Sequence, residues 1–137
     1  MKRTVLTPAL SATVLLLAMQ AAHAGPQAHV VCSYSHTLGD DAIMMYGMPN
    51  EAMLHDFFGN VQTDAYSSRE SLRTQEKTTC DNKADSSAYW APSLKLPDGT
   101  VVNPAYQKTY YQASNVDAWP LHPFPAGLSL LAGDHHG

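Results

Sequence analysis

The sequence predicts a small, mainly β (α+β) domain with one or two short helices and one disulfide. β-branched and aromatic residues alternate in several short segments that Gly and Pro separate, which is typical of strands joined by turns. The chain has two cysteines, Cys32 and Cys80, and an even number predicts a bond between them in an oxidising compartment. Neither lies in a CxxC motif, which favours a disulfide over a thiolate metal or catalytic site.

Residues 1–24 predict a cleavable signal peptide. The start is basic ("MKR"), an apolar stretch centred on "VLLLAM" (14–19) follows, and "AHA" (22–24) offers small residues for cleavage after Ala24. The apolar stretch is too short for a transmembrane helix. We therefore expect a secreted or periplasmic protein in which residues 25–137 form one domain, with no integral membrane segment after cleavage.

The composition is acidic, because 8 Lys and Arg face 12 Asp and Glu and give a formal net charge of -4. Loss of the signal peptide also removes Lys2 and Arg3, which makes the remaining chain more acidic. Such a surface repels the phosphates of nucleic acids and anionic membrane surfaces. The charge therefore excludes nucleic acid as a partner.

The first expected element is a strand at "AHVVCSYSH" (28–36), where β-branched and aromatic residues alternate. A turn-rich break, "TLGDDA" (37–42), follows it. The next segment, "IMMYGMP" (43–49), is expected to begin extended and to end where Gly47 and Pro49 interrupt it.

One helix is expected to start at Ser67, in "SSRESLRTQEK" (67–77). The Ser67 hydroxyl and the Glu70 side chain have the spacing of a capping box, in which each bonds the other's backbone amide. Leu72 is the only large aliphatic residue in this segment, so the helix should be short and should lie on the surface.

The second half of the chain predicts a hairpin followed by a strand. The segments "SAYWAPSLKL" (87–96) and "VVNPAYQKTYYQA" (101–113) flank the turn "PDGT" (97–100). Pro92 and Pro104 cannot donate to a ladder, so they should mark edges or strand ends.

The proline-rich segment "NVDAWPLHPFPA" (115–126) predicts a packed loop, because Trp119 and Phe124 should be buried. The segment "GLSLLAG" (127–133) predicts a last apolar strand with an edge prone to self-association.

Seven segments carry a resemblance: "CSYSHTLGDDAI", "HDFFGN", "ESLR", "TTC", "SSAYWAPSL", "TYY" and "PFPAGLSLLAGD". In this order they resemble the secreted DUF1996 family of bacteria and fungi, over nearly all of residues 25–137. The function of that family is unknown. Its members often sit beside carbohydrate-binding or cell-wall-associated domains, so the resemblance implies a polysaccharide setting.

The chain departs from the family pattern in two ways. It ends at "AGDHHG", where the family domain continues, so the resemblance is to the N-terminal half of that domain. The family has His-Leu-His-Asp where this chain has Met53-Leu54-His55-Asp56, and Ala42 replaces a family proline. Both departures bear on any site that the full family domain assembles.

Five residues are the candidates for catalysis: His36, Asp40, Asp41, His55 and Asp56. Carboxylates and imidazoles in one cleft can act as general base and orienting group, or can coordinate a divalent ion. The alternative is structural, with the carboxylates bonded to turn amides and the histidines satisfied within the fold. On the first interpretation the protein binds or processes an extracellular or cell-wall polysaccharide, and whether it is an enzyme stays open.

Asn60, Tyr89 and Trp90 are the candidates for substrate binding. Aromatic side chains have large apolar faces that can stack on the apolar faces of sugar rings. Packing in the core is the alternative for both aromatic residues.

A second hypothesis is a periplasmic or secreted copper- or zinc-binding protein. Its ligands would be His36, His55, Met48 and Met53, with Met44 and Met45 nearby. Thioether and imidazole ligands together favour Cu(I). Methionine is also a common flexible filler of cores, which is the structural alternative. A third hypothesis is a truncated structural remnant without a ligand.

Overall fold

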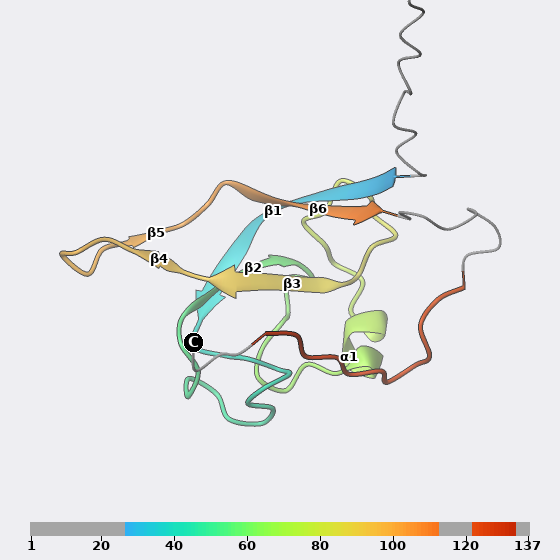
Figure 1. Cartoon of the computed structure of the whole chain (residues 1–137), viewed down its shortest axis with the longest axis horizontal. Coiled ribbons are helices and arrows are strands. Elements are labelled where there is room, and N and C mark those ends of the chain that lie inside the picture. Colours follow the sequence, from blue (N-terminus) through green and yellow to red (C-terminus); the bar gives the residue numbers. More distant parts are fainter. Residues whose placement is uncertain (1–26, 113–121, 134–137) are drawn as a thin grey trace, which may run out of the picture.

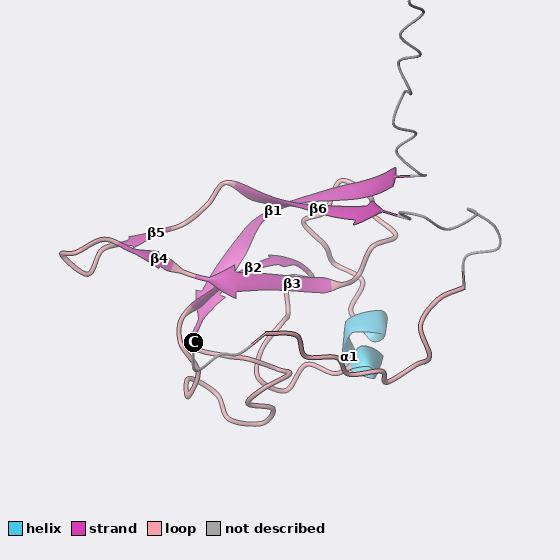
Figure 2. Ribbon diagram, viewed as in Figure 1, coloured by secondary structure: helices cyan, strands magenta, loops and turns pink. Residues whose placement is uncertain are grey.

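A computed structural model describes residues 27–112 and 122–133. These residues form six strands and one short helix, which confirms the mainly β class (Figure 1, Figure 2). The elements are β1 (Gln27–Leu38), β2 (His55–Gly59), α1 (Arg69–Thr74), β3 (Ala88–Pro92), β4 (Leu94–Lys95), β5 (Val101–Val102) and β6 (Tyr106–Gln112).

Strand β1 organises a four-stranded antiparallel sheet of order β3-β2-β1-β6 (Figure 1). Residues 27–33 of β1 pair with β6, and residues 34–38 pair with β2 on the other side. The register shifts between Tyr34 and His36 at this change of partner. A bulge of this kind bends a strand and increases its twist, so the sheet curls along β1.

Alternation along β2 gives the sheet two different faces. His55 and Phe57 point to one face, which we call the Trp90 face because Trp90 of β3 pairs with Phe57. The two rings lie 5.8 Å apart between centroids. Asp56 and Phe58 point to the opposite face, which we call the cystine face.

The cystine face holds the small apolar core, which consists of Val30, Cys32, Phe58 and Cys80. The predicted Cys32–Cys80 disulfide is present and joins residues 48 positions apart. Closing a loop of this length stabilises a fold by about 4 kcal/mol in the chain-entropy model. The bond therefore compensates for the limited apolar area that so small a domain can bury.

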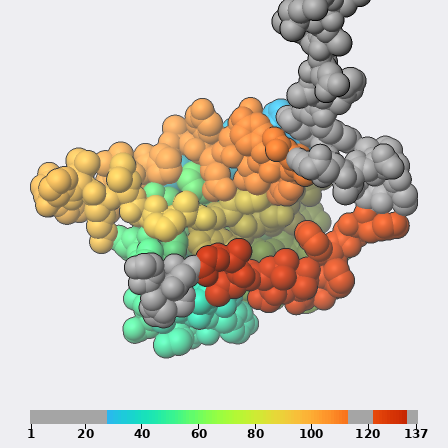
Figure 3. Space-filling view, viewed as in Figure 1, coloured from blue at the N-terminus to red at the C-terminus, as the bar shows by residue number. Residues whose placement is uncertain are grey.

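The Trp90 face is covered by loops, by α1 and by the C-terminal segment. Residues 122–133 run past α1 towards the loop that connects β1 and β2 (Figure 1). In the space-filling view the same segment crosses the front of the molecule below β3 (Figure 3). The C-terminal segment covers this face loosely, because its large apolar side chains remain exposed.

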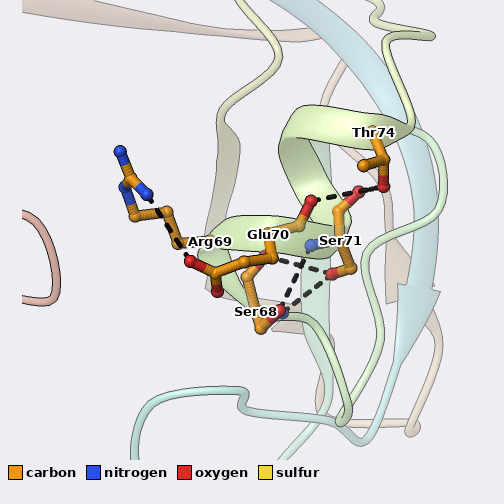
Figure 4. Close-up of polar contacts among 5 residues, drawn as sticks. All are labelled: Ser68, Arg69, Glu70, Ser71 and Thr74. Carbon is orange, nitrogen blue, oxygen red and sulfur yellow. Dashed lines mark hydrogen bonds and ion pairs between the residues drawn. The ribbon is translucent and has the colours of Figure 1, made fainter.

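The N-cap of α1 lies one residue later than predicted. Its N-cap is Ser68, whose side chain accepts a hydrogen bond from the Ser71 amide while the Ser71 hydroxyl accepts one from the Ser68 amide (Figure 4). The prediction of a box between Ser67 and Glu70 was wrong. The Ser67 hydroxyl bonds Asp64 instead, which closes the turn before the helix.

The predicted hairpin turn is confirmed between β4 and β5. The Leu96 amide donates to the Thr100 carbonyl at 2.9 Å, and Gly99 takes the positive φ of 87° that the turn requires. Pro92 is the last residue of β3, an edge strand, as its missing amide predicts.

Three expectations about other segments were wrong. Residues 43–49 form turns rather than an extended start, because the Asp41 carboxylate binds the amides that follow it. Residues 127–133 form no strand, since no strand edge pairs with them. Phe124 is 80% exposed rather than buried.

Some expectations fall outside the described residues. These are the signal peptide at 1–24 and the burial of Trp119. Within residues 27–112 and 122–133, no helix has the length and apolar character needed to cross a membrane.

Candidate functional site

His36 lies flat against Phe57 on the Trp90 face, with ring centroids 5.0 Å apart and ring planes 8° from parallel. Its Nε2 lies 2.8 Å from the Thr63 carbonyl oxygen, and its Nδ1 lies 2.8 Å from the Ser35 hydroxyl. Both ring nitrogens are therefore engaged within the protein. The arrangement fixes a distant loop onto the sheet and leaves neither nitrogen for a ligand.

Asp40 is almost fully buried and uses both carboxylate oxygens within the fold. One oxygen accepts from the Asn50 amide at 2.7 Å and the other from the Ala65 amide at 3.0 Å. Its backbone carbonyl lies 3.0 Å from Nδ1 of His55. Asp40 thus holds two loops together and positions the His55 ring.

Asp41 anchors the turn that follows β1. Its carboxylate accepts hydrogen bonds from the Ile43 and Met44 amides, each at 2.9 Å. Its backbone carbonyl accepts from the Met45 amide, also at 2.9 Å. This residue sets the position of the first methionines of the loop.

Asp56 lies on the cystine face, away from the two histidines. One carboxylate oxygen accepts from the Thr37 hydroxyl at 2.6 Å and from the Ser93 hydroxyl at 3.0 Å. The structure therefore does not bring Asp56 together with His55, its neighbour in the sequence. Alternation along β2 explains the separation.

Asn60 is completely buried and its side chain bonds only to backbone. The amide nitrogen lies within 3.3 Å of the carbonyl oxygens of Leu72, Gln75 and Ser86, and its oxygen accepts from the Gln62 amide. It joins the end of β2 to α1 and to the segment before β3. This placement leaves none of its polar atoms for a substrate.

Tyr89 and Trp90 point to opposite faces of β3, so they do not form one stacking surface. The Tyr89 hydroxyl donates to Asp85 at 2.8 Å and lies 2.9 Å from the Tyr111 hydroxyl. Burial first, and then these two hydrogen bonds, raise the pKa of Tyr89 far above its usual range. Tyr89 is therefore a protonated donor within the fold.

Trp90 lines an open cavity of about 600 Å³ between the sheet and α1. Arg69 and Arg73 of α1 line the same cavity. Serine residues from both sides contribute polar groups, and Leu128 closes one part of the wall. The lining residues that carry polar side chains are Ser67, Ser68, Arg69, Arg73, Ser86 and Ser87.

His55 lines a second cavity of about 490 Å³ at the other end of the Trp90 face. Met44, Met45 and Met53 line it too, and Leu131 of the C-terminal segment completes the wall. The ring of His55 is buried, with its Nε2 free of any hydrogen bond to the described residues. The two cavities share no lining residue.

The structure therefore brings some of the predicted site residues together and separates others. His36 and His55 both contact Phe57, so the structure brings these imidazoles to the same face. The backbone carbonyl of Asp40 lies next to the His55 ring, whereas the Asp56 side chain lies on the cystine face. The ligand set of the copper or zinc hypothesis is not brought together as a whole, because His36 and Met48 do not line the cavity of His55.

A family model described as "Domain of unknown function (DUF1996)" matches residues 41–137. The chain belongs to this family. The prediction of the family is confirmed, with a small difference in extent: the match covers the C-terminal part of the chain and begins after the "CSYSH" motif of β1, rather than covering nearly all of residues 25–137. Neither a curated protein nor a solved structure matched the chain.

In this DUF1996 chain, the sequence pattern did not lead to the prediction of Arg69 and Arg73 as site residues. Arg69 and Arg73 are four residues apart, so they lie on one side of α1. This spacing is visible in the sequence of the predicted helix, and it is the signal that could have identified the two arginines as site candidates. Their position opposite Trp90 depends on how α1 packs, which the local pattern does not contain.

Proposed function

We propose that this protein is an exported polysaccharide-binding domain that recognises carboxylated sugars in the Trp90 cavity. The observation that carries the proposal is the combination of one aromatic ring, several hydroxyls and two guanidinium groups around a single open cavity of about 600 Å³. A cavity of this size is typical of small-molecule sites, and its open form suits a segment of a longer chain.

Trp90 supplies the apolar surface for a sugar ring. One side of its indole packs towards Phe57, with centroids 5.8 Å apart, and the side chain is only half-buried. The remainder contributes to the cavity wall. An aromatic side chain fixed in this way loses little conformational entropy when it stacks on a ligand.

Arg69 and Arg73 favour an anionic ligand in an otherwise acidic protein. Arg69 forms an exposed ion pair with Glu70 at 3.5 Å (Figure 4), and such pairs contribute little stability. Arg73 forms no ion pair with the described residues. Guanidinium groups bind carboxylates through paired hydrogen bonds, so a uronate is the sugar class that fits.

Binding fits this cavity better than cleavage does. Glycoside hydrolysis uses a pair of carboxyl groups on either side of the scissile bond. The described residues around the Trp90 cavity include no Asp, Glu or His. The chemistry available there is stacking, hydrogen bonding and charge pairing.

Export is part of the same proposal. The Cys32–Cys80 disulfide is compatible with an oxidising compartment, where extracellular polysaccharides are found. The leader pattern of residues 1–24 supports the same location.

Affinity electrophoresis through gels that contain a polyuronate or a neutral glucan tests the proposal. We expect the polyuronate to retard the protein more than the glucan does. Arg73→Gln should weaken polyuronate binding by about tenfold, because a hydrogen bond to a charged group contributes about 1.5 kcal/mol or more. Trp90→Ala should weaken binding to any sugar that the cavity accepts.

Lys77→Gln is the matched control, because it removes one positive charge close to α1 from a residue outside the cavity. An equal loss of polyuronate binding in Lys77→Gln and Arg73→Gln would show that only the net charge matters. This result would contradict a site at Arg73. Absence of retardation by every glycan would refute polysaccharide binding itself.

A further inference from the structure

We propose that His55 and the methionines around it form a binding site for Cu(I), separate from the Trp90 cavity. The ligands would be Nε2 of His55 and the thioethers of Met44, Met45 and Met53, which line one cavity of about 490 Å³. This set differs from the one expected from the sequence, because two methionines of the preceding turn replace His36 and Met48.

The hydrogen bond of His55 prepares its other nitrogen for a metal. Nδ1 lies 3.0 Å from the Asp40 carbonyl oxygen, and a carbonyl can only accept, so Nδ1 carries the proton. In the neutral ring, Nε2 then presents a lone pair. Histidines that bind metals commonly donate their second N–H to a backbone carbonyl in this way, which fixes the tautomer and the ring orientation.

The support behind His55 is rigid. Asp40 is held by the Asn50 and Ala65 amides, which bond its two carboxylate oxygens. The His55 ring also packs edge-on against Phe57, with centroids 6.4 Å apart. A ligand whose ring is fixed from two sides loses little freedom when it binds an ion.

The methionines reach the cavity from two sides of the loop between β1 and β2. Asp41 places Met44 and Met45 through hydrogen bonds to both backbone amides, each at 2.9 Å. Met53 is two residues before His55, at the entry to β2. Met44 and Met53 are 46% and 67% exposed, which is unusual for methionines that only fill a core.

The donor set favours Cu(I) over harder ions. Thioethers are soft ligands and select Cu(I), whereas zinc prefers imidazole, thiolate and carboxylate donors. Asp41 and Glu51 also line the cavity, but the described residues contain no cluster of three His, Cys, Asp or Glu side chains that could hold a metal. Besides these two carboxylates, the cavity offers three sulfurs and one imidazole nitrogen, which is a predominantly soft set of donors.

A competition titration with Cu(I) under anaerobic conditions tests the site. Purified full-length chain with its disulfide intact is titrated against the chromogenic Cu(I) chelator bathocuproine disulfonate. We expect the protein to retain one equivalent of Cu(I) and to retain Ag(I) in the same way. Met44→Leu and Met53→Leu, which conserve side-chain volume, should each lower the affinity by about tenfold or more.

Met48→Leu is the matched control, because Met48 belongs to the same loop and is 48% exposed but does not line the cavity. All three substitutions are at exposed positions, so they should leave the fold intact. Equal retention by all four proteins, an equal loss in Met48→Leu, or no retention by the wild type would each overturn the site. None of these outcomes depends on whether the Trp90 cavity binds a glycan.

Discussion

Gly59 is the position at which the backbone of β2 tolerates no side chain. Its φ is 79°, in the left-handed region that favours glycine. A Cβ atom at this residue would also collide with the backbone carbonyl oxygen of Ser87. The same carbonyl accepts the Asn60 amide at 2.9 Å, so the segment before β3 cannot move away without loss of that bond.

Gly59→Ala should therefore destabilise the fold by about 3 kcal/mol, from the left-handed backbone and from the collision together. Gly99→Ala is the matched control, because Gly99 has a φ of 87° but open space around its Cβ position. It should cost only the backbone contribution, about 1 kcal/mol. Urea denaturation measures both values, and equal losses would show that the close approach to Ser87 has no energetic effect.

For single residues, the sequence predicted which polar side chains are important more successfully than it predicted their roles. His36, Asp40 and Asn60 are all buried or half-buried polar residues, as candidates for a site are. Their partners are backbone groups such as the Thr63 carbonyl and the Ala65 amide, far away in the sequence. Only the folded chain brings these groups together, so local patterns could not separate a structural role from a chemical one.

Asp81 fastens the segment that carries Cys80 to strand β1. Its carboxylate accepts from the Val31 amide at 3.1 Å, and its own amide donates to the Val31 carbonyl at 2.8 Å. The hydrogen bond from Val31, and then that from Asn82, lower the pKa of Asp81. The attachment therefore depends on the ionised form of this side chain.

Acid should weaken this attachment. A carboxyl group whose pKa is lower in the folded state stabilises the fold above its unfolded pKa, about 4, and this contribution is lost as the pH falls through the folded value. Asp81→Asn keeps an oxygen acceptor but no longer titrates. Its melting temperature should therefore fall less than that of the wild type between about pH 6 and about pH 2.

Glu76→Gln is the control for this comparison, because Glu76 is exposed and accepts no hydrogen bond from the described residues. If the melting temperatures of wild type and Asp81→Asn fall equally across the acid range, Asp81 does not contribute to the loss of stability in acid.

The elements were predictable where the signal is local. The turn at Gly99 and the end of β3 at Pro92 follow from backbone restrictions that each residue imposes. The N-cap of α1 was misplaced by one residue because Ser67 and Ser68 both have the spacing of a cap, and the Ser67 hydroxyl is bonded to Asp64 instead. Residues 127–133 have the composition of a strand, but a strand also has to pair with another strand, and the composition of a segment does not reveal whether it will.

The described part of the molecule has a small core and a large exposed apolar surface. Phe124, Leu128 and Leu130 lie around one open cavity of about 500 Å³ next to α1, and they are 80%, 47% and 71% exposed. We call these three residues the C-terminal apolar patch. Monomeric proteins rarely leave a contiguous apolar surface of this kind in water unless something binds it.

Self-association through the C-terminal apolar patch is therefore expected as the concentration rises. Static light scattering should give an average mass that increases with protein concentration. The double variant Phe124→Lys with Leu130→Lys should abolish the increase, because each lysine places a charge where apolar contact would form. The double variant Leu94→Lys with Leu96→Lys adds the same charge at exposed apolar residues in and beside β4, away from the patch, and should associate like the wild type. A wild type that stays monomeric at high concentration, or a control pair that dissociates as fully as the patch variant, would contradict association through this surface.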